Sequence, residues 1–146
     1  MKILMVCLGN ICRSPLAEGV MRHLVNEKGL DWQIASAGTG NWHVGNAPDR
    51  RSIAVARNLG YDISGQKAQH FNKRFFEDYD HILVMDKNNL KDVLALAETD
   101  EHKQKVRLFL LNDKELVDPY YDNNLFEPVC KEVEQRCKEI LKELHS

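Results

Sequence analysis

Short apolar runs alternate along the chain with longer segments in which apolar residues recur at helical spacing. The first run covers residues 2–7 and ends before Gly9, a pattern typical of a strand buried on both faces of a sheet. From Pro15 the period changes to that of an amphipathic helix, with Ser14 as the expected N-cap and Gly29 as the expected stop. The chain therefore begins with a predicted strand, loop and helix.

The same alternation continues to the end of the sequence. Further strands are predicted at 32–36, 82–85 and 106–111, and loops at 37–41 and 117–124. One helix is predicted to open at Pro48 and Asp49, another to follow Asp86 as its cap, and a third to run from Phe126 to Leu144. Strands that alternate with helices imply a parallel sheet covered on both faces, which is a doubly wound α/β fold. Such sheets bind ligands beyond the carboxyl ends of their strands, so the loop after the first strand is the first place to look for chemistry.

Composition and charge narrow the class of protein. The chain has 146 residues, 43% hydrophobic and 29% charged, which fits one ordinary globular domain. Its 20 Lys and Arg against 22 Asp and Glu argue against a nucleic-acid binder, although not against one basic pocket. No apolar run approaches the roughly 20 residues of a membrane span, and the first run is too short for a signal peptide. We expect a cytoplasmic protein with no membrane partner, whose four cysteines are thiols.

Cys7 and Arg13 stand in the C-x5-R relation of cysteine-dependent phosphatases. Cys130 and Arg136 have the same spacing, but they fall inside the predicted C-terminal helix with no glycine between them, so no loop can form there. The structural context that the motif requires is present only at Cys7, at the end of a buried strand.

The residues between Cys7 and Arg13 suit the binding of an anion. Gly9 and Asn10 can adopt positive φ, so that successive N–H groups turn inward, and the next helix points its positive end at the same place. The Arg13 guanidinium can bind two oxygens of a phosphoryl group. These features also favour the thiolate form of Cys7, which predicts a nucleophile; Ser14 can donate a hydrogen bond to this thiolate.

Transfer of a phosphoryl group to a cysteine also needs an acid that protonates the leaving alcohol. The best candidate is Asp118, in the loop after the last predicted strand, where Pro119 stiffens the chain and two tyrosines offer aromatic surface. An Asp-Pro pair is also common in surface turns. Its occurrence together with Cys7 favours the acid.

Residues 6–15, which read VCLGNICRSP, resemble the signature of the low molecular weight protein tyrosine phosphatases, and Asp118 to Tyr121 (DPYY) resembles the general-acid loop of that family. Segments 36–39, 45–49 and 82–86 are also similar to family segments. The resemblance runs nearly end to end. It implies one domain over 1–146, with a four-stranded parallel sheet in the flavodoxin-like order 2-1-3-4 and helices on both faces.

The family resemblance implies a role for each matching residue. Cys7 would attack phosphorus and form a phosphocysteine, Arg13 would bind the phosphate, and Asp118 would act as general acid and then as base. The rest of the phosphate-binding loop would be Leu8, Gly9, Asn10, Ile11, Cys12 and Ser14, supported by Ser36. The phosphotyrosine ring would lie among Leu8, Trp42, Tyr120 and Tyr121. No cofactor and no metal are implied, and the six histidines show no zinc-binding spacing.

Some residues near the predicted site allow two interpretations, and others depart from the family pattern. In the family, the pair that matches Cys7 and Cys12 can form a protective disulfide; Cys12 is otherwise a packed thiol. Trp42 is either a wall of the substrate cleft or a simple surface aromatic. His43 is expected to be exposed to solvent rather than catalytic. The family often has glycine where Asp122 follows the tyrosine pair, and many members have histidine where Gly65 follows Ser64.

The predicted substrate is a protein that carries phosphotyrosine, for which a bacterial tyrosine kinase is one candidate, and the predicted state is a monomer or a weak dimer. Three alternatives remain. A thioredoxin-linked arsenate reductase would need further redox cysteines, but Cys130 and Cys137 are expected in a helix core. A protein-arginine phosphatase usually has threonine where this chain has Ile11. A phosphocysteine carrier would lack the pair formed by Arg13 and Asp118.

Overall fold

The computed structural model describes residues 1–145, in which four strands alternate with helices. Their order is β1 (Lys2–Cys7), α1 (Arg13–Glu27), β2 (Gln33–Gly38), α2 (Arg50–Asn58), α3 (Phe75–Asp78), β3 (His81–Val84), α4 (Lys87–Leu94), α5 (Asp100–Gln104), β4 (Val106–Leu108), η1 (Asn123–Leu125) and α6 (Phe126–His145). All strand pairs are parallel and the sheet order is β2-β1-β3-β4. The predicted fold class and strand order are therefore confirmed.

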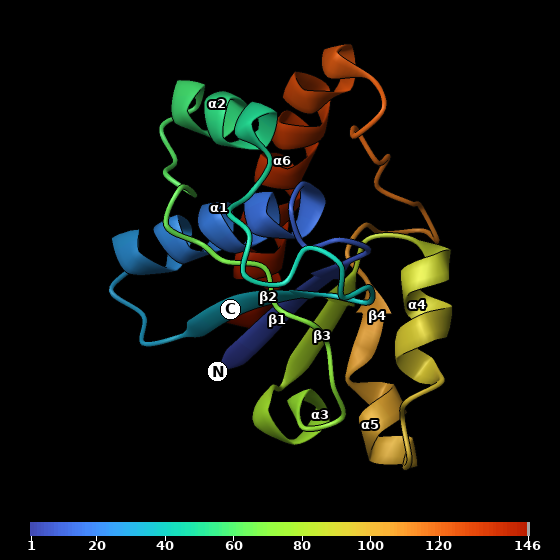
Figure 1. The fold of residues 1–146 in the computed structure, drawn as a ribbon. Coiled ribbons are helices and arrows are strands. Elements are labelled where there is room, and N and C mark those ends of the chain that lie inside the picture. The colour runs from blue at the N-terminus through green and yellow to red at the C-terminus, as the bar shows by residue number, and fades with distance from the viewer. Residues whose placement is uncertain (146) are drawn as a thin grey trace.

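The two faces of the sheet are covered by different helices, as Figure 1 shows: α1, α2 and α6 lie on one side, and α3, α4 and α5 lie on the other. Along β1, Ile3 and Met5 belong to the core beneath α1 and α6, whereas Leu4 and Val6 belong to the core on the opposite face. Because alternate residues of a strand point to opposite faces, a strand buried on both sides needs a continuous apolar run. This is why residues 2–7 read as a strand.

Strand β1 lies between β2 and β3, and its carboxyl end is the place where the order of the strands reverses. Cys7, its last residue, pairs with Gly38 of β2, and the preceding Val6 pairs with Val84 of β3. The loop from β1 to α1 therefore opens at the switch point where doubly wound sheets bind ligands.

Several predicted strand boundaries differ from the observed ones. Strand β2 runs from Gln33 to Gly38 rather than over 32–36, because Ala37 and Gly38 continue the pairing with Val6 and Cys7 of β1. Strand β4 ends at Leu108 instead of 111, and β3 spans His81–Val84 rather than 82–85. Helices α3 and α5 were not predicted, since four and five residues are too few to show a helical period.

The first residues of α2 and α4 lie where they were predicted, whereas the predicted N-cap of α1 is wrong. Asp86 caps α4 with its carboxylate, as predicted, and Asp49 caps α2, where a helix was predicted to open. Ser14 is not the N-cap of α1: the helix starts at Arg13, two residues before the predicted first residue Pro15, and its N-cap, Cys12, makes no side-chain cap hydrogen bond. The reason is that the Ser14 hydroxyl is engaged in the loop that precedes the helix. At the other end, Gly29 has a φ of 67° and ends the helix as expected.

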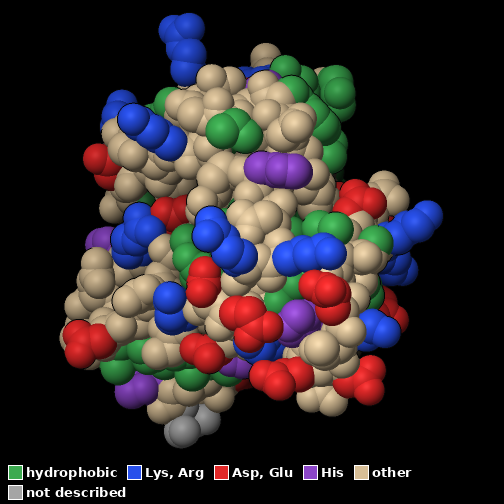
Figure 2. Space-filling model, turned by 60° about the horizontal axis from the view of Figure 1, so that its bottom comes forward, with side chains coloured by type: hydrophobic (Ala, Val, Ile, Leu, Met, Phe, Trp, Pro, Cys, Tyr) green, Lys and Arg blue, Asp and Glu red, His purple; other side chains and the backbone are tan. Residues whose placement is uncertain are grey.

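The surface carries charges of both signs. On the face drawn in Figure 2, Lys and Arg side chains are interspersed with Asp and Glu, so the described residues form no continuous basic area there. Within residues 1–145, no helix has the length and apolar character that crossing a membrane requires.

Candidate active site

The sulfur of Cys7 lies at the carboxyl end of β1 and is surrounded by hydrogen-bonding groups. Cys7 is only 3% exposed. The Asn10 N–H donates to its Sγ at 3.3 Å, and the Ser14 Oγ lies 3.0 Å from the same atom. We call residues 7–14 the phosphate loop. When Cys7 is a thiolate, both neighbours act as donors to it.

Asn10 holds the shape of the phosphate loop. Its φ of 57° turns the chain, as predicted, and it is 2% exposed. Its Nδ2 donates to Ser14 Oγ at 2.7 Å and to Ser36 Oγ at 2.9 Å, while its Oδ1 accepts from the Gln69 N–H at 2.9 Å. A buried amide with every group bonded has a single favourable position, so Asn10 fixes the loop before any ligand arrives.

Gly9 has a different role from the one predicted. Its φ is not positive, and Asn10 alone supplies the left-handed turn of the loop. A Cβ on Gly9 would lie 3.1 Å from Cδ2 of His43, so the glycine permits the close approach of that ring. His43 is half-buried and faces the cleft, which is less exposed than expected.

The hydrogen-bonded chain behind Cys7 ends on Glu18, which the sequence analysis did not identify. The Ser36 Oγ donates to Glu18 Oε1 at 2.6 Å, and Arg22 lies 2.7 Å from Oε2. Burial raises the pKa of the Glu18 carboxyl, although the contacts with Ser36 and Arg22 act in the opposite direction. The signal in the sequence was a glutamate on the apolar face of α1, in the first turns after the loop.

Arg13 is held through one of its two terminal nitrogens, while the other lies on the side of Asp118 at the cleft. It is 3% exposed, and its Nη1 donates to Asp86 Oδ2 and to Leu116 O, both at 2.8 Å. Its Nη2 lies 3.8 Å from Oδ2 of Asp118. Asp86 was predicted only as a helix cap, and here the same carboxylate also orients the guanidinium.

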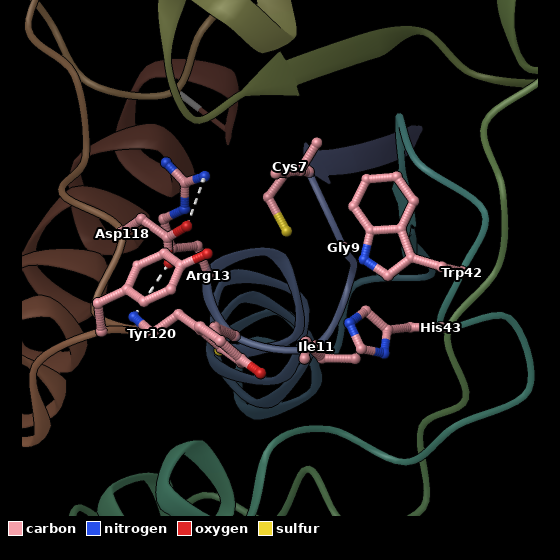
Figure 3. A pocket seen from close by; sticks show the side chains of 11 residues that line it. Cys7, Gly9, Ile11, Arg13, Trp42, His43, Asp118 and Tyr120 are labelled. Atoms are coloured by element: carbon pink, nitrogen blue, oxygen red, sulfur yellow. Dashed lines mark hydrogen bonds and ion pairs between the residues drawn. The ribbon is translucent and has the colours of Figure 1, made fainter.

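These side chains surround one cleft of about 330 Å³. Figure 3 shows the Cys7 sulfur in the middle, with Trp42 and His43 on one side and with Asp118, Arg13 and Tyr120 on the other. We call residues 117–125 the acid segment. Most of the predicted site residues line the cleft: Cys7, Leu8, Gly9, Ile11, Cys12, Arg13, Trp42, Asp118, Tyr120 and Tyr121. Asn10, Ser14 and Ser36 do not line the cleft; they form a buried hydrogen-bonded group that supports the loop from within.

The walls of the cleft are aromatic and open to solvent. Trp42 is 62% exposed and Tyr121 is 90% exposed, and the rings of Tyr120 and Tyr121 meet edge to face at 5.0 Å. Trp42 lines the same cleft as Cys7, which favours its interpretation as a wall of the cleft over that of a simple surface aromatic. A flat ring that enters the cleft would find apolar surface on both sides.

Cys12 lines the cleft but differs from Cys7 in its surroundings. Burial, followed by the nearby Asp49 carboxylate, raises the pKa of the Cys12 thiol to about 12, so Cys12 is a protonated thiol at neutral pH. All four cysteines are free. The disulfide between Cys7 and Cys12 stays a prediction.

The arrangement suits attack on an anionic phosphorus centre. A nucleophilic sulfur, a fixed guanidinium and a carboxyl group meet in a preformed cradle, which is the set required for transfer of a phosphoryl group and protonation of its leaving oxygen. Within residues 1–145, no group of three His, Cys, Asp or Glu side chains is arranged to hold a metal ion.

The chain is similar to known proteins over nearly its whole length. The family model described as Low molecular weight phosphotyrosine protein phosphatase matches residues 2–146. The low molecular weight protein-tyrosine-phosphatase YfkJ of Bacillus subtilis is 37% identical over 95% of this chain and 92% of its own length. The human low molecular weight phosphotyrosine protein phosphatase is 37% identical over 98% and 95%. The crystal structure of the tyrosine phosphatase Wzb from Escherichia coli K30 with sulphate has a TM-score of 0.87 and 34% identity, covering 98% of this chain and 97% of Wzb.

Proposed function

Because this chain belongs to the low molecular weight phosphotyrosine protein phosphatase family, we propose that it hydrolyses phosphotyrosine in proteins, and small aryl phosphates, through a phosphocysteine at Cys7. The observation that carries the proposal is the meeting of three groups at one cleft. These are the Cys7 sulfur held by Asn10 and Ser14, the Arg13 guanidinium, and the Asp118 carboxyl.

In the first step the Cys7 thiolate attacks phosphorus, and the bond between phosphorus and the tyrosine oxygen breaks. Asp118 donates its proton to that oxygen, so the product leaves as neutral tyrosine. Arg13 and the N–H groups of the phosphate loop bind the phosphoryl oxygens and stabilise the charge of the transition state. Since the phosphate loop is already fixed by Asn10, little rearrangement accompanies this step.

In the second step a water molecule attacks the phosphocysteine. Asp118, now a carboxylate, accepts a proton from the water, the sulfur–phosphorus bond breaks, and inorganic phosphate forms. The Ser14 hydroxyl lies 3.0 Å from the Cys7 sulfur and donates a hydrogen bond to the departing thiolate. We assign Ser36 to the support of this network through Asn10.

The substrate ring is proposed to lie between the aromatic walls. Leu8, Trp42 and the tyrosine pair are all partly exposed at the mouth of the cleft, where they are available to a ligand without rearrangement of the core. Such walls bind any flat aryl group, so we expect them to affect KM more than kcat.

Cys12 is proposed to protect Cys7 by forming a reversible disulfide with it under oxidising conditions. Its own pKa of about 12 makes it a poor nucleophile at neutral pH. This difference supports Cys7, and not Cys12, as the group that attacks phosphorus.

Two alternatives from the sequence gain no support from the structure. Cys130 and Cys137 are both fully buried in α6, and burial raises the pKa of each, which does not suit the mobile redox cysteines of an arsenate reductase. A phosphocysteine carrier must retain its phosphoryl group, whereas Arg13 and Asp118 lie together at the cleft and favour its release to water. The third alternative, a protein-arginine phosphatase, is disfavoured by a single residue, Ile11. Phosphoarginine is therefore a substrate to compare directly with phosphotyrosine.

We propose that 1–146 acts as a single domain, in the cytoplasm, as a monomer or weak dimer, with a phosphotyrosine-containing protein as its partner. A bacterial tyrosine kinase is our candidate for that partner. Reducing conditions suit the reaction, because the mechanism needs Cys7 as a free thiolate.

The test compares the natural chain with Cys7→Ser on a phosphotyrosine peptide, a phosphoarginine peptide, and arsenate with thioredoxin. We expect turnover of the phosphotyrosine peptide by the natural chain alone, since a serine hydroxyl is a far weaker nucleophile than a thiolate. Cys130→Ser is the matched control, and it should retain full activity. Wild-type turnover by Cys7→Ser, or arsenate reduction without phosphatase activity, would contradict the assignment.

A further inference from the structure

Arg51, near the start of α2, is connected to the phosphate loop through one neighbouring residue. Its Nε donates to Asp49 Oδ1 at 3.0 Å and its Nη2 donates to Oδ2 at 2.8 Å, a two-point ion pair. The Asp49 N–H in turn donates to the carbonyl of Ile11 at 2.8 Å. One side of the guanidinium is therefore fixed relative to the phosphate loop.

The other side of the same guanidinium contacts the acid segment and the helix that follows it. Its Nη1 donates to Asn123 Oδ1 at 2.7 Å. Its central carbon lies 4.4 Å from the ring centre of Phe126 and 5.3 Å from that of Tyr120. The flat face of a guanidinium packs favourably on aromatic rings, while its N–H groups donate hydrogen bonds in the plane of the guanidinium itself. Three residues of one short stretch thus converge on Arg51.

The acid segment has few other anchors. In the described part of the chain, two side-chain polar contacts connect 117–125 to other segments: the hydrogen bond from Arg51 to Asn123, and the pair of Arg13 with Asp118. The second is long, at 3.8 Å, and it involves the proposed acid itself. The side-chain hydrogen bonds within the segment are local, such as that from the Tyr120 N–H to Asp118. Arg51 is therefore the main external anchor of the segment.

We infer that Arg51 is a positioning residue for the proposed acid, which sets where Asp118 and Tyr120 lie over Cys7. Arg51 does not line the cleft and touches no reacting atom. A carboxyl group protonates a leaving oxygen efficiently only over a narrow range of positions, and an exposed segment without its anchor samples many. The inference rests on the proposed function, because it assigns Asp118 the role of acid.

The test measures kcat/KM of Arg51→Ala for two substrates that depend differently on the acid. Phenyl phosphate has a poor leaving group that needs a proton, whereas 4-nitrophenyl phosphate has a good one that leaves as the anion. We expect kcat/KM to fall about tenfold for phenyl phosphate and no more than about threefold for 4-nitrophenyl phosphate. Arg51→Lys keeps the charge but not the fork, so it should restore only part of the loss.

Two further variants separate positioning from general damage to the fold. Asn123→Ala leaves the ion pair of Arg51 with Asp49 intact and removes only the hydrogen bond from Arg51 to the acid segment, so it should shift the ratio of the two substrates in the same direction. Arg50→Ala removes the exposed neighbouring arginine and should change neither rate. An equal fall for both substrates in Arg51→Ala, or no change in either, overturns the inference.

A second measurement does not depend on catalysis. Hydrogen exchange of the backbone amides, followed by mass spectrometry, should speed up in 117–125 of Arg51→Ala while 7–14 keeps its protection. Unchanged exchange in 117–125 overturns the inference whether or not the chain is a phosphatase. Absence of hydrolysis by the natural chain, together with faster exchange in Arg51→Ala, would refute the proposed function and leave the anchor established.

Discussion

Two segments meet over Cys7, and they are built in opposite ways. In the phosphate loop, Asn10 and Arg13 are almost fully buried, and their side chains are held by hydrogen bonds from several elements. In the acid segment, Asp118 is 38% exposed and Tyr121 is 90% exposed, and few side-chain contacts reach the rest of the chain.

Under the proposed function, the difference between the two segments follows from what each segment binds. A phosphoryl group has a fixed shape and charge, so donors that are already in place avoid the cost of reorganisation in the transition state. The rest of a substrate protein varies, and a segment with few anchors can adapt to it. Rigid binding of the phosphate and adjustable contact with the leaving group are thus separated within one cleft.

The largest effect is expected for Arg13→Lys, which tests whether the phosphate loop depends on its fixed donors. A lysine presents a single ammonium group, which cannot contact Asp86, Leu116 O and a phosphoryl group at once. We expect kcat/KM for an aryl phosphate to fall about a thousandfold. Steady-state kinetics measures this, with Arg50→Lys as an exposed control. A fall of less than about tenfold would mean that the fork geometry of Arg13 is dispensable.

Asp118→Asn tests the acid segment, and its effect on kcat/KM should be smaller than that of Arg13→Lys. We expect kcat/KM for a phosphotyrosine peptide to fall about a hundredfold, because an amide cannot donate a proton to the leaving oxygen. Binding of inorganic phosphate, measured by calorimetry, should not weaken, since Arg13 and the loop amides are untouched. Asp122→Asn, a carboxylate in the same segment, is the control. Equal losses in both variants would argue against a specific acid.

The smallest expected effect is on the pH dependence of stability. Burial raises the pKa of Glu18 above the value of about 4.3 that glutamate has in an unfolded chain. Between these two pKa values the folded chain binds more protons than the unfolded chain, so the free energy of unfolding falls as the pH rises through that window. Glu18→Gln should remove this part of the decline.

Urea unfolding at a series of pH values from 4 upward measures the effect on the natural chain and on Glu18→Gln. Glu101→Gln, at an exposed position of α5, is the control and should follow the natural chain. If the free energy of unfolding changes with pH in the same way in the natural chain and in Glu18→Gln, titration of Glu18 does not contribute to stability.

The sequence alone was enough to predict the sheet and to propose Cys7 as the nucleophile. Strand β1 was recognisable because burial on both faces demands a continuous apolar run, and Cys7 because it ends that run and stands six positions before Arg13. Asp86 was recognisable as a cap, because a carboxylate before a helical period has a specific local role.

The contacts between distant segments could not be predicted from local patterns. Glu18 and Asp86 gain their roles from Ser36 and Arg13, which lie far away in the sequence. Arg51 looked like one of two adjacent arginines on a short helix, and only the fold brings it to Asn123 and Phe126. The misplaced N-cap has the same cause: Ser14 has tertiary partners that compete with capping.

The most direct test of the central claim is to trap the covalent intermediate. The natural chain is mixed with a phosphotyrosine peptide, denatured at neutral pH within a single turnover, and digested for mass spectrometry. We expect a phosphoryl group on the peptide that contains Cys7 and no such group in Cys7→Ser. Turnover without any phosphorylated enzyme, or a phosphoryl group on a different residue, would contradict the phosphocysteine mechanism.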